Sequence, residues 1–262
     1  MSRREGKRRR MKEEKKNLRK EGDKKNCSHY IIFIVSLIVF SIFMSQLVFA
    51  DPDGVTGNVL SNETKASTSA FEINISGGYI STINITAVTQ NLKWKAFVGD
   101  FTGKFTLDDA SGSTIYDWTL ATVSGEIFAT RNSSSLTWSS IDCANVTHIE
   151  TENVNLNHTN SQDNITATFS SSTHPGFFVG SVEIAQDSCG YVLNTYVNDA
   201  AQTSDFYEVA LYTGSSMVYT TILEQNQTGF DGEGYDFQMI APEVGYPGFS
   251  GSTAYYLYAE LT

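Results

Sequence analysis

Acidic side chains offer the first candidates for chemistry in this sequence. Three of them, Asp231, Glu233 and Asp236, fall within the run DGEGYD together with two glycines. Carboxylate oxygens on a flexible turn are ligands that Ca²⁺ prefers, although this spacing is not that of an EF-hand. Turns that join strands have a similar composition. The run therefore predicts a weak calcium site, with a plain turn as the alternative, and no other cofactor is expected.

Carboxylates also serve as the acid and base of glycosidases, because that chemistry depends on their separation in space. The candidates for such a pair are Asp108, Asp109, Glu126, Asp231 and Glu233. Most of the 24 acids beyond Ala50 are expected to be solvated at the surface. The sequence has no HExxH, GxSxG, P-loop or dinucleotide-binding motif. We predict that the protein is not an enzyme, with an extracellular hydrolase as the minor alternative.

Two cysteines, Cys143 and Cys189, lie beyond the hydrophobic segment described below, whereas Cys27 precedes it. An even pair in an oxidising compartment predicts one disulfide. Two buried free thiols are the alternative. A zinc site needs more ligands than this pair supplies.

Arg131 is the only arginine beyond residue 25. A lone guanidinium among so many acids is expected to pair with a carboxylate such as Glu126. The alternative is a role in gripping an anionic ligand, for which the guanidinium fork is suited.

Asn-x-Ser/Thr triplets occur about twice as often beyond Ala50 as the composition would give by chance. We predict glycosylation at several of them, and the alternative is that Asn and Thr merely crowd polar strand faces. The eight sites are Asn62, Asn74, Asn84, Asn132, Asn145, Asn157, Asn164 and Asn226.

The N-terminal part of the chain has the composition of a segment that would direct the residues after Ala50 out of the cell. The predicted basic region, residues 1–29, includes 13 of the 18 Lys and Arg residues, and residues 30–50 carry no charge. A stretch of this length spans the hydrocarbon core of a bilayer as a helix, and the positive charges keep its N-terminal side in the cytoplasm. Cleavage after Ala50 would make this segment a signal peptide. An uncleaved anchor that keeps the protein on the membrane is the alternative.

Charge divides the chain sharply. Beyond Ala50 there are 5 basic and 24 acidic residues, so the formal charge there is 5 − 24 = −19. Such a surface repels phosphate backbones, because nucleic-acid affinity requires Lys and Arg. No nucleic-acid partner is expected.

The composition of the exported part predicts a linker, residues 51–69, followed by one all-β domain, residues 70–262. Apolar and polar residues alternate in short runs bounded by Gly, Asn and Asp, which indicates half-buried strands. Gly77-Gly78 suggests a hairpin joining two of these runs. We expect a β-sandwich of Ig-like or jelly-roll style and no amphipathic helix after the hydrophobic segment. The runs centre on Ile73, Ile83, Phe105, Trp118, Ala167 and Leu257.

A pattern of about forty residues from Trp94 to Arg131 resembles secreted archaeal cell-surface β-rich proteins of uncharacterised function. The resemblance implies an archaeal envelope setting and no activity. Physically, the glycines suit turns and the aromatic residues suit a sheet core. The matching positions are Trp94, Gly99, Gly103, Leu107, Asp109, Ala110, Gly112, Tyr116, Trp118, Gly125, Glu126 and Ala129.

These features predict an extracellular or cell-surface glycoprotein with a structural, assembly or adhesion role. Its expected partners are further copies of itself, envelope proteins or glycans. One alternative is a module that binds extracellular glycans or small ligands through exposed Trp and Tyr. Another is a type IV pilin-like filament subunit, although Asp51-Pro52-Asp53-Gly54 would interrupt the helical stalk of such a protein.

Overall fold

The computed structural model describes residues 50–159, 162–246 and 251–262. The predicted basic region and residues 30–49 of the predicted membrane segment lie outside the described residues. Phe49–Thr262 form one compact unit. No helix in the described ranges is both long enough and apolar enough to cross a membrane.

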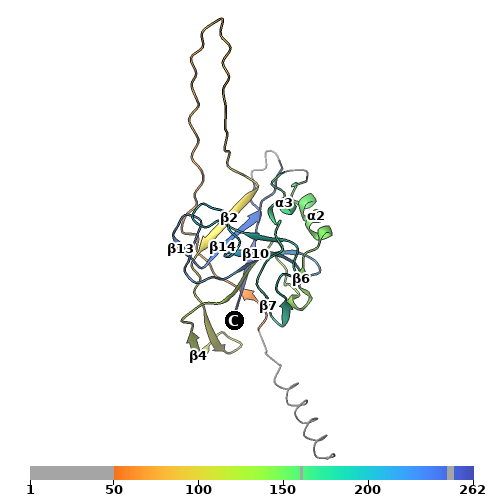
Figure 1. Ribbon diagram of the computed structural model, residues 1–262. Helices are drawn as coiled ribbons and strands as arrows, with labels where there is room; N and C mark the ends of the chain where they lie inside the picture. The colour runs from red at the N-terminus through yellow and green to blue at the C-terminus, as the bar shows by residue number, and fades with distance from the viewer. Residues whose placement is uncertain (1–49, 160–161, 247–250) are drawn as a thin grey trace, which may run out of the picture. The chain divides into compact units, whose positions relative to one another are not determined.

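A seven-stranded antiparallel sheet lies at the centre of the described part of the chain (Figure 1). β9 (Val192–Asn194) and β6 (Asp142–Cys143) share the outer edge of β10. The prediction of a mostly β protein is confirmed. The strand order is β1 (Asp53–Gly54), β15 (Tyr256–Leu261), β5 (Gly125–Thr130), β11 (Met217–Ile222), β10 (Tyr207–Tyr212) and β6.

The central strands β5, β10 and β11 are buried on both faces, so apolar side chains occur on both faces of each strand. In β5, Ile127 and Ala129 belong to the core on one face, while Phe128 belongs to the core on the other. Such alternation is the period of a strand. Two hydrophobic cores therefore share one sheet.

The first face is covered by the paired strands β2 (Trp94–Gly99) and β14 (Phe237–Pro242) and by two helices, α2 (Val146–Asn155) and α3 (Ile165–Thr168). Phe169 and Tyr219 are fully buried in this core. The two rings pack with their centroids 5.8 Å apart.

The second face is covered by the hairpin of β7 (Phe177–Val179) and β8 (Val182–Ile184) and by the 3₁₀ helix η1 (Trp138–Ser140). Phe128 packs here against Trp138, with ring centroids 5.2 Å apart. Two further pairs complete the strands. They are β3 (Lys104–Asp108) with β4 (Thr114–Thr119), and β12 (Gln227–Thr228) with β13 (Gly234–Tyr235).

Cys143 and Cys189 form the predicted disulfide, with Cα atoms 5.1 Å apart. Cys143 lies in β6, and Cys189 lies three residues before β9. Both short strands pair with β10, so the disulfide holds together an edge that few hydrogen bonds secure. Closing a loop of 46 residues contributes about 4 kcal/mol in the chain-entropy model.

The prediction of no helix beyond the hydrophobic segment was wrong. Asn145 caps α2 by accepting a hydrogen bond from the backbone N–H of His148, whose ring accepts one from the backbone N–H of Asn145. The expected strand around Ala167 is instead α3. Ile165 and Phe169 stand four residues apart, so one helical turn buries both, and Asn164 caps it.

The expected hairpin around Gly77-Gly78 forms only in part. The two glycines make a turn, but residues 55–93, all of which are described, contain no strand. An isolated two-stranded hairpin is marginal in water, and here nothing packs against its apolar side. The middle of residues 55–92, a segment called the arm below, projects beyond the sheet as two extended limbs (Figure 1), whereas Val55 at its start still bonds to Leu257 of β15. The predicted linker also begins inside the fold, since β1 pairs with β15.

Candidate functional site

Two of the three carboxylates of the calcium hypothesis, those of Asp231 and Asp236, are engaged by protein donors. Asp231 accepts hydrogen bonds from the backbone N–H of Glu233 and from the hydroxyl of Tyr235. Asp236 accepts from the backbone N–H groups of Phe101 and Asn226. The described residues contain no group of three or more His, Cys, Asp or Glu placed to hold a metal ion. The arrangement is that of a hydrogen-bonded turn.

The carboxylates considered for hydrolysis lie in three places: Asp108 and Asp109 at the end of β3, Glu126 in β5, and Asp231 and Glu233 in the β12–β13 turn. Asp108 ends β3, and Asp109 accepts hydrogen bonds from the backbone N–H groups of Ser113 and Ser111 in the β3–β4 turn. These bonds lower the pKa of Asp109. Because of these bonds, Asp109 has the environment of a turn-stabilising residue. Glu126, by contrast, is buried in β5.

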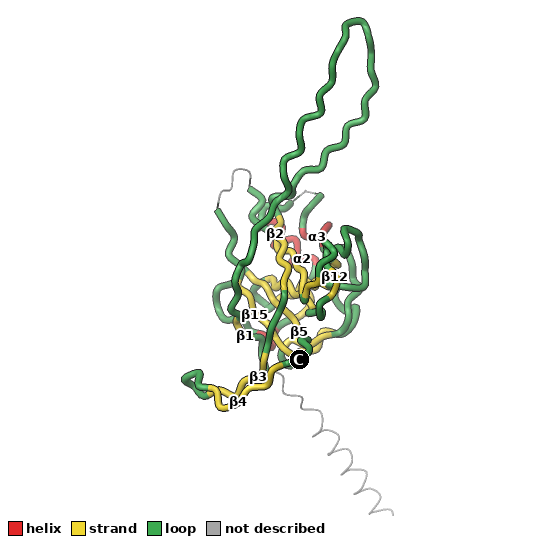
Figure 2. The backbone as a smooth tube through the Cα atoms, turned by 90° about the vertical axis from the view of Figure 1, so that its left-hand side faces the viewer, coloured by secondary structure: helices red, strands yellow, loops and turns green. Residues whose placement is uncertain are grey.

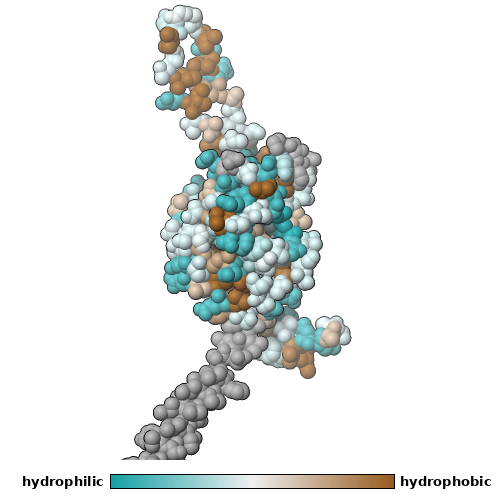
Figure 3. Space-filling view, turned by 90° about the vertical axis from the view of Figure 1, so that its right-hand side faces the viewer, coloured by the Kyte–Doolittle hydropathy of each residue, from teal (hydrophilic) through white to brown (hydrophobic). Residues whose placement is uncertain are grey.

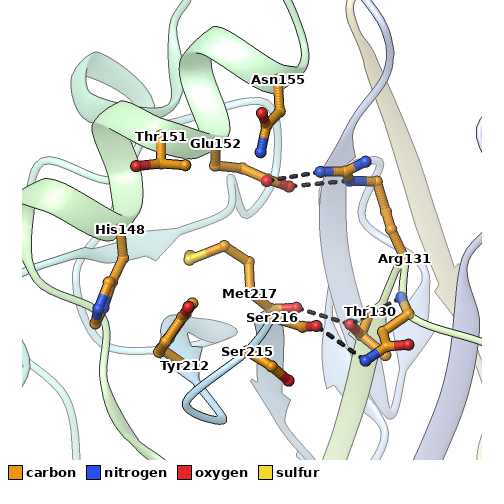
Figure 4. Close-up of a pocket in the computed structure, with 11 residues that line it drawn as sticks. Thr130, Arg131, His148, Thr151, Glu152, Asn155, Tyr212, Ser215, Ser216 and Met217 are labelled. Atoms are coloured by element: carbon orange, nitrogen blue, oxygen red, sulfur yellow. Dashed lines mark hydrogen bonds and ion pairs between the residues drawn. The ribbon is translucent and has the colours of Figure 1, made fainter. Parts of the chain in front are cut away.

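A polar pocket of about 400 Å³ lies between α2 and the adjoining ends of β5, β10 and β11 (Figure 4). Helix α2 supplies one wall and the β10–β11 turn another. The lining residues are Thr130, Arg131, Asn132, His148, Thr151, Glu152, Asn155, Tyr212, Ser215, Ser216 and Met217.

Arg131 forms a two-pronged ion pair with Glu152 across this pocket (Figure 4). Its Nε and Nη2 atoms lie 3.0 and 2.6 Å from the two carboxylate oxygens. The Glu152 side chain is nearly buried, whereas that of Arg131 is one third exposed. The expectation of a carboxylate partner is confirmed, but Glu126 was the wrong choice. The partly exposed guanidinium keeps donors available to a ligand.

The pocket also contains a stacked aromatic pair that the sequence did not reveal. The rings of His148 and Tyr212 are parallel, with centroids 3.7 Å apart. The capping pattern of Asn145 and His148 could have signalled the helix that supplies His148, but nothing local links it to Tyr212. Aromatic faces beside hydroxyl, amide and charged groups suit a small polar ligand.

The arm is the most exposed apolar region of the described chain. Ile75 and Ile80 in it are almost wholly exposed. Figure 3 shows apolar residues gathered along the arm, away from the packed body. The other large apolar side chains exposed in the arm are Val59, Leu60, Phe71, Ile73, Tyr79, Ile83, Ile85, Val88 and Leu92.

The β3–β4 hairpin presents a second apolar surface, defined by Phe105, Leu107, Tyr116 and Trp118. The register pairs Phe105 with Trp118 and Leu107 with Tyr116, so all four side chains share one face. All four are exposed, and the hairpin projects from the sheet (Figure 2). On its other side, Lys104 and Asp117 form an ion pair at 2.7 Å. This is an amphipathic hairpin whose apolar face has no cover in the described chain.

The sequons separate into two groups by exposure. Five are exposed: Asn62, Asn74, Asn84, Asn145 and Asn226. Three are half-buried, and in two of these Nδ2, the atom that carries a glycan, donates to a neighbour. Nδ2 of Asn132 donates to Ser216 Oγ, and that of Asn157 donates to the carbonyl of Gly245. In Asn145 and Asn164 the helix cap uses only Oδ1.

Comparisons with protein-family models, with curated proteins and with solved structures each found no match for this chain.

Proposed function

We propose that this chain is an extracellular or cell-surface structural glycoprotein whose copies assemble through the arm and the β3–β4 hairpin. The observation that carries the proposal is the row of exposed apolar side chains on both features, beside a body whose two cores are fully packed. Exposed apolar surfaces of this kind mark sites of protein association.

The occupant we propose for these surfaces is a second copy of the chain. Beyond Ala50 the formal charge is −19, so two copies repel each other over most of their surface. Residues 70–92 of the arm contain one charged residue, Glu72, and are the place where copies meet with least repulsion. An extended limb can also add to a sheet edge of another molecule through its free backbone groups.

Light scattering of the purified protein tests this proposal. Replacing Ile73, Ile75, Ile83 and Ile85 by Thr removes the isoleucines that alternate on either side of Gly77-Gly78 and leaves the sequons of the arm intact. We expect large assemblies from the original chain and monomers from this variant, with the same Tm for the folded body.

The matched control replaces Val146 and Val154, two exposed apolar residues of α2, by Thr. This variant is expected to assemble like the original chain. If the original chain is monomeric at all concentrations, the assembly proposal is wrong.

The pocket beside Arg131 supports a second candidate function, the binding of a small polar ligand such as a glycan. The partly exposed guanidinium and the aromatic pair of His148 and Tyr212 are the observations that favour it. A glycan array probes this directly. Binding that Tyr212→Ala abolishes would support the pocket, and no signal above background would remove it.

Several earlier expectations belong to this proposal. They are export with cleavage after Ala50 or anchoring by an uncleaved helix, an archaeal envelope setting, and a β-sandwich in which β2 and β14 form part of the second layer. The pilin-like alternative is weakened, because Asp51–Gly54 lead directly into strand pairing with β15 rather than into a helical stalk.

A further inference from the structure

Two buried carboxylates face each other at one side of the central sheet. Glu126 of β5 and Glu260 of β15 are direct register partners, and they are 4% and 5% exposed. Gly180, in the β7–β8 turn, donates its backbone N–H to Glu260 Oε2 at 2.7 Å. Glu126 Oε2 and Glu260 Oε1 have no hydrogen-bond partner. Buried carboxylates without a partner are costly, so this place calls for a cation.

No side chain in the described chain supplies that cation. The charges that act on the pair are acidic, since Asp51 acts on Glu260 and Glu260 acts on Glu126. All five basic residues beyond Ala50 are engaged elsewhere. Lys65 bonds to Val88, Lys93 to Asp163, Lys95 to Asn62, Lys104 to Asp117 and Arg131 to Glu152.

The backbone of Asp51 lies beside this pair. A Cβ atom built on Gly180 would stand 2.6 Å from the Oδ1 atom of Asp51 and 3.6 Å from its Cα atom, and Gly180 itself bonds to Glu260. Asp53 is the register partner of Ala259, so continuing the ladder places Pro52 opposite Glu260. The backbone of Asp51 thus lies beside the glycine whose N–H binds Glu260.

We propose that cleavage of the Ala50–Asp51 bond creates the missing cation, an α-ammonium group on Asp51 that pairs with the Glu260 carboxylate. An export-associated peptidase would add water across the amide bond. The carboxylate stays on Ala50, and the new amine of Asp51 takes up a proton near neutral pH. Both residues of the bond are exposed, so a peptidase has access to it.

Processing would then fasten strand β1 to β15. β1 is only two residues long, and beyond it a single further hydrogen bond, from the backbone N–H of Val55 to the carbonyl of Leu257, joins this segment to β15. An ion pair at its start anchors this short edge strand in the mature chain and not in the precursor. The inference rests on the cleavage that the proposed function includes, but it concerns stability and not assembly.

The test compares two forms of the compact unit that begin at Asp51, one with a free α-amino group and one acetylated at that group. At pH 7 we expect the free form to melt about 2–8 °C higher, as the gain of one ion pair gives in a protein of this size. The difference should shrink above pH 9, where the amine loses its proton.

Two variants separate the pairing from a general effect of charge. In Glu260→Gln the difference in Tm between free and acetylated forms should vanish. In Glu208→Gln, which changes a buried carboxylate on the other face of the sheet, the difference should persist. Equal Tm values for the two forms, or an unchanged difference in Glu260→Gln, would overturn the inference. A native N-terminus other than Asp51 would instead overturn the processing step of the proposed function.

Discussion

The central sheet and the arm both carry apolar residues two positions apart, yet only the sheet buries them. In β5, Ile127 and Ala129 are buried because strands lie on both sides and side chains cover both faces. In the arm, Ile73 and Ile75 have the same spacing and stay exposed. Alternation therefore specifies the two faces of a strand, and only a partner turns it into stable structure.

The sharpest way to break this comparison is to truncate a phenyl ring in each region. Phe128→Ala should lower the free energy of unfolding by about 3–5 kcal/mol, because it removes a fully buried ring and leaves a cavity. Phe71→Ala in the arm should change it by less than about 0.5 kcal/mol. Denaturant melts of both variants under conditions that keep the chain monomeric check this, and equal losses would contradict the described exposure.

Removing the disulfide is expected to come next in size. Cys143→Ser with Cys189→Ser should cost about 2–5 kcal/mol, because the edge formed by β6 and β9 loses its cross-link. The arm lies outside the closed loop, so its sensitivity to proteases should not change. Melting curves and limited proteolysis of the same samples provide the measurement, with the reduced original chain as control.

The pH dependence of stability also distinguishes the sheet from the arm, because Glu126 is buried in the sheet and Glu72 is exposed in the arm. Burial, and next the charge of Glu260, raises the pKa of Glu126 from 4.5 to about 8. The folded state then binds more protons than the unfolded state between these pH values, so stability falls as pH rises through this window. In a chain with a blocked N-terminus, Glu126→Gln should raise Tm by several degrees at pH 8 and leave it unchanged at pH 4. The matched change Glu72→Gln in the exposed arm should have no effect at either pH.

Glycan occupancy is expected to follow exposure and to alter stability least. Mass spectrometry of glycopeptides from the native protein should find glycans at Asn74 and Asn84 in the arm. It should find none at Asn157, whose Nδ2 donates to the carbonyl of Gly245 and whose backbone has a φ of +55°. A glycan on Asn157 would show that the chain around it opens before folding is complete.

The sequence predicted the features that depend on residues close together in the chain. Alternation located β15 and β4, and the glycines located the turn at Gly77-Gly78. It failed where a short-range pattern fits two structures. Ile165, Ala167 and Phe169 alternate like a strand, but two of them also match one helical turn, and the cap at Asn164 decides for α3.

The candidate sites were harder to foresee, because they form between residues distant in sequence. The pairing of Arg131 with Glu152 depends on the place where α2 packs, and α2 itself was not predicted. Glu126 meets Glu260 only through the register of β5 with β15. The sequence shows that acidic residues outnumber basic ones beyond Ala50, but it does not show that two of the acids, Glu126 and Glu260, are buried opposite each other.

The position of β15 between β1 and β5 also sets an order of events (Figure 2). Asp53 and Ala259 pair across about 200 residues of chain, so the sheet cannot close until residues 256–261 have left the ribosome. Pairings of such long range form slowly. A chain exported as proposed would therefore cross the membrane before its sheet has formed, and the sheet would be completed only outside the cell.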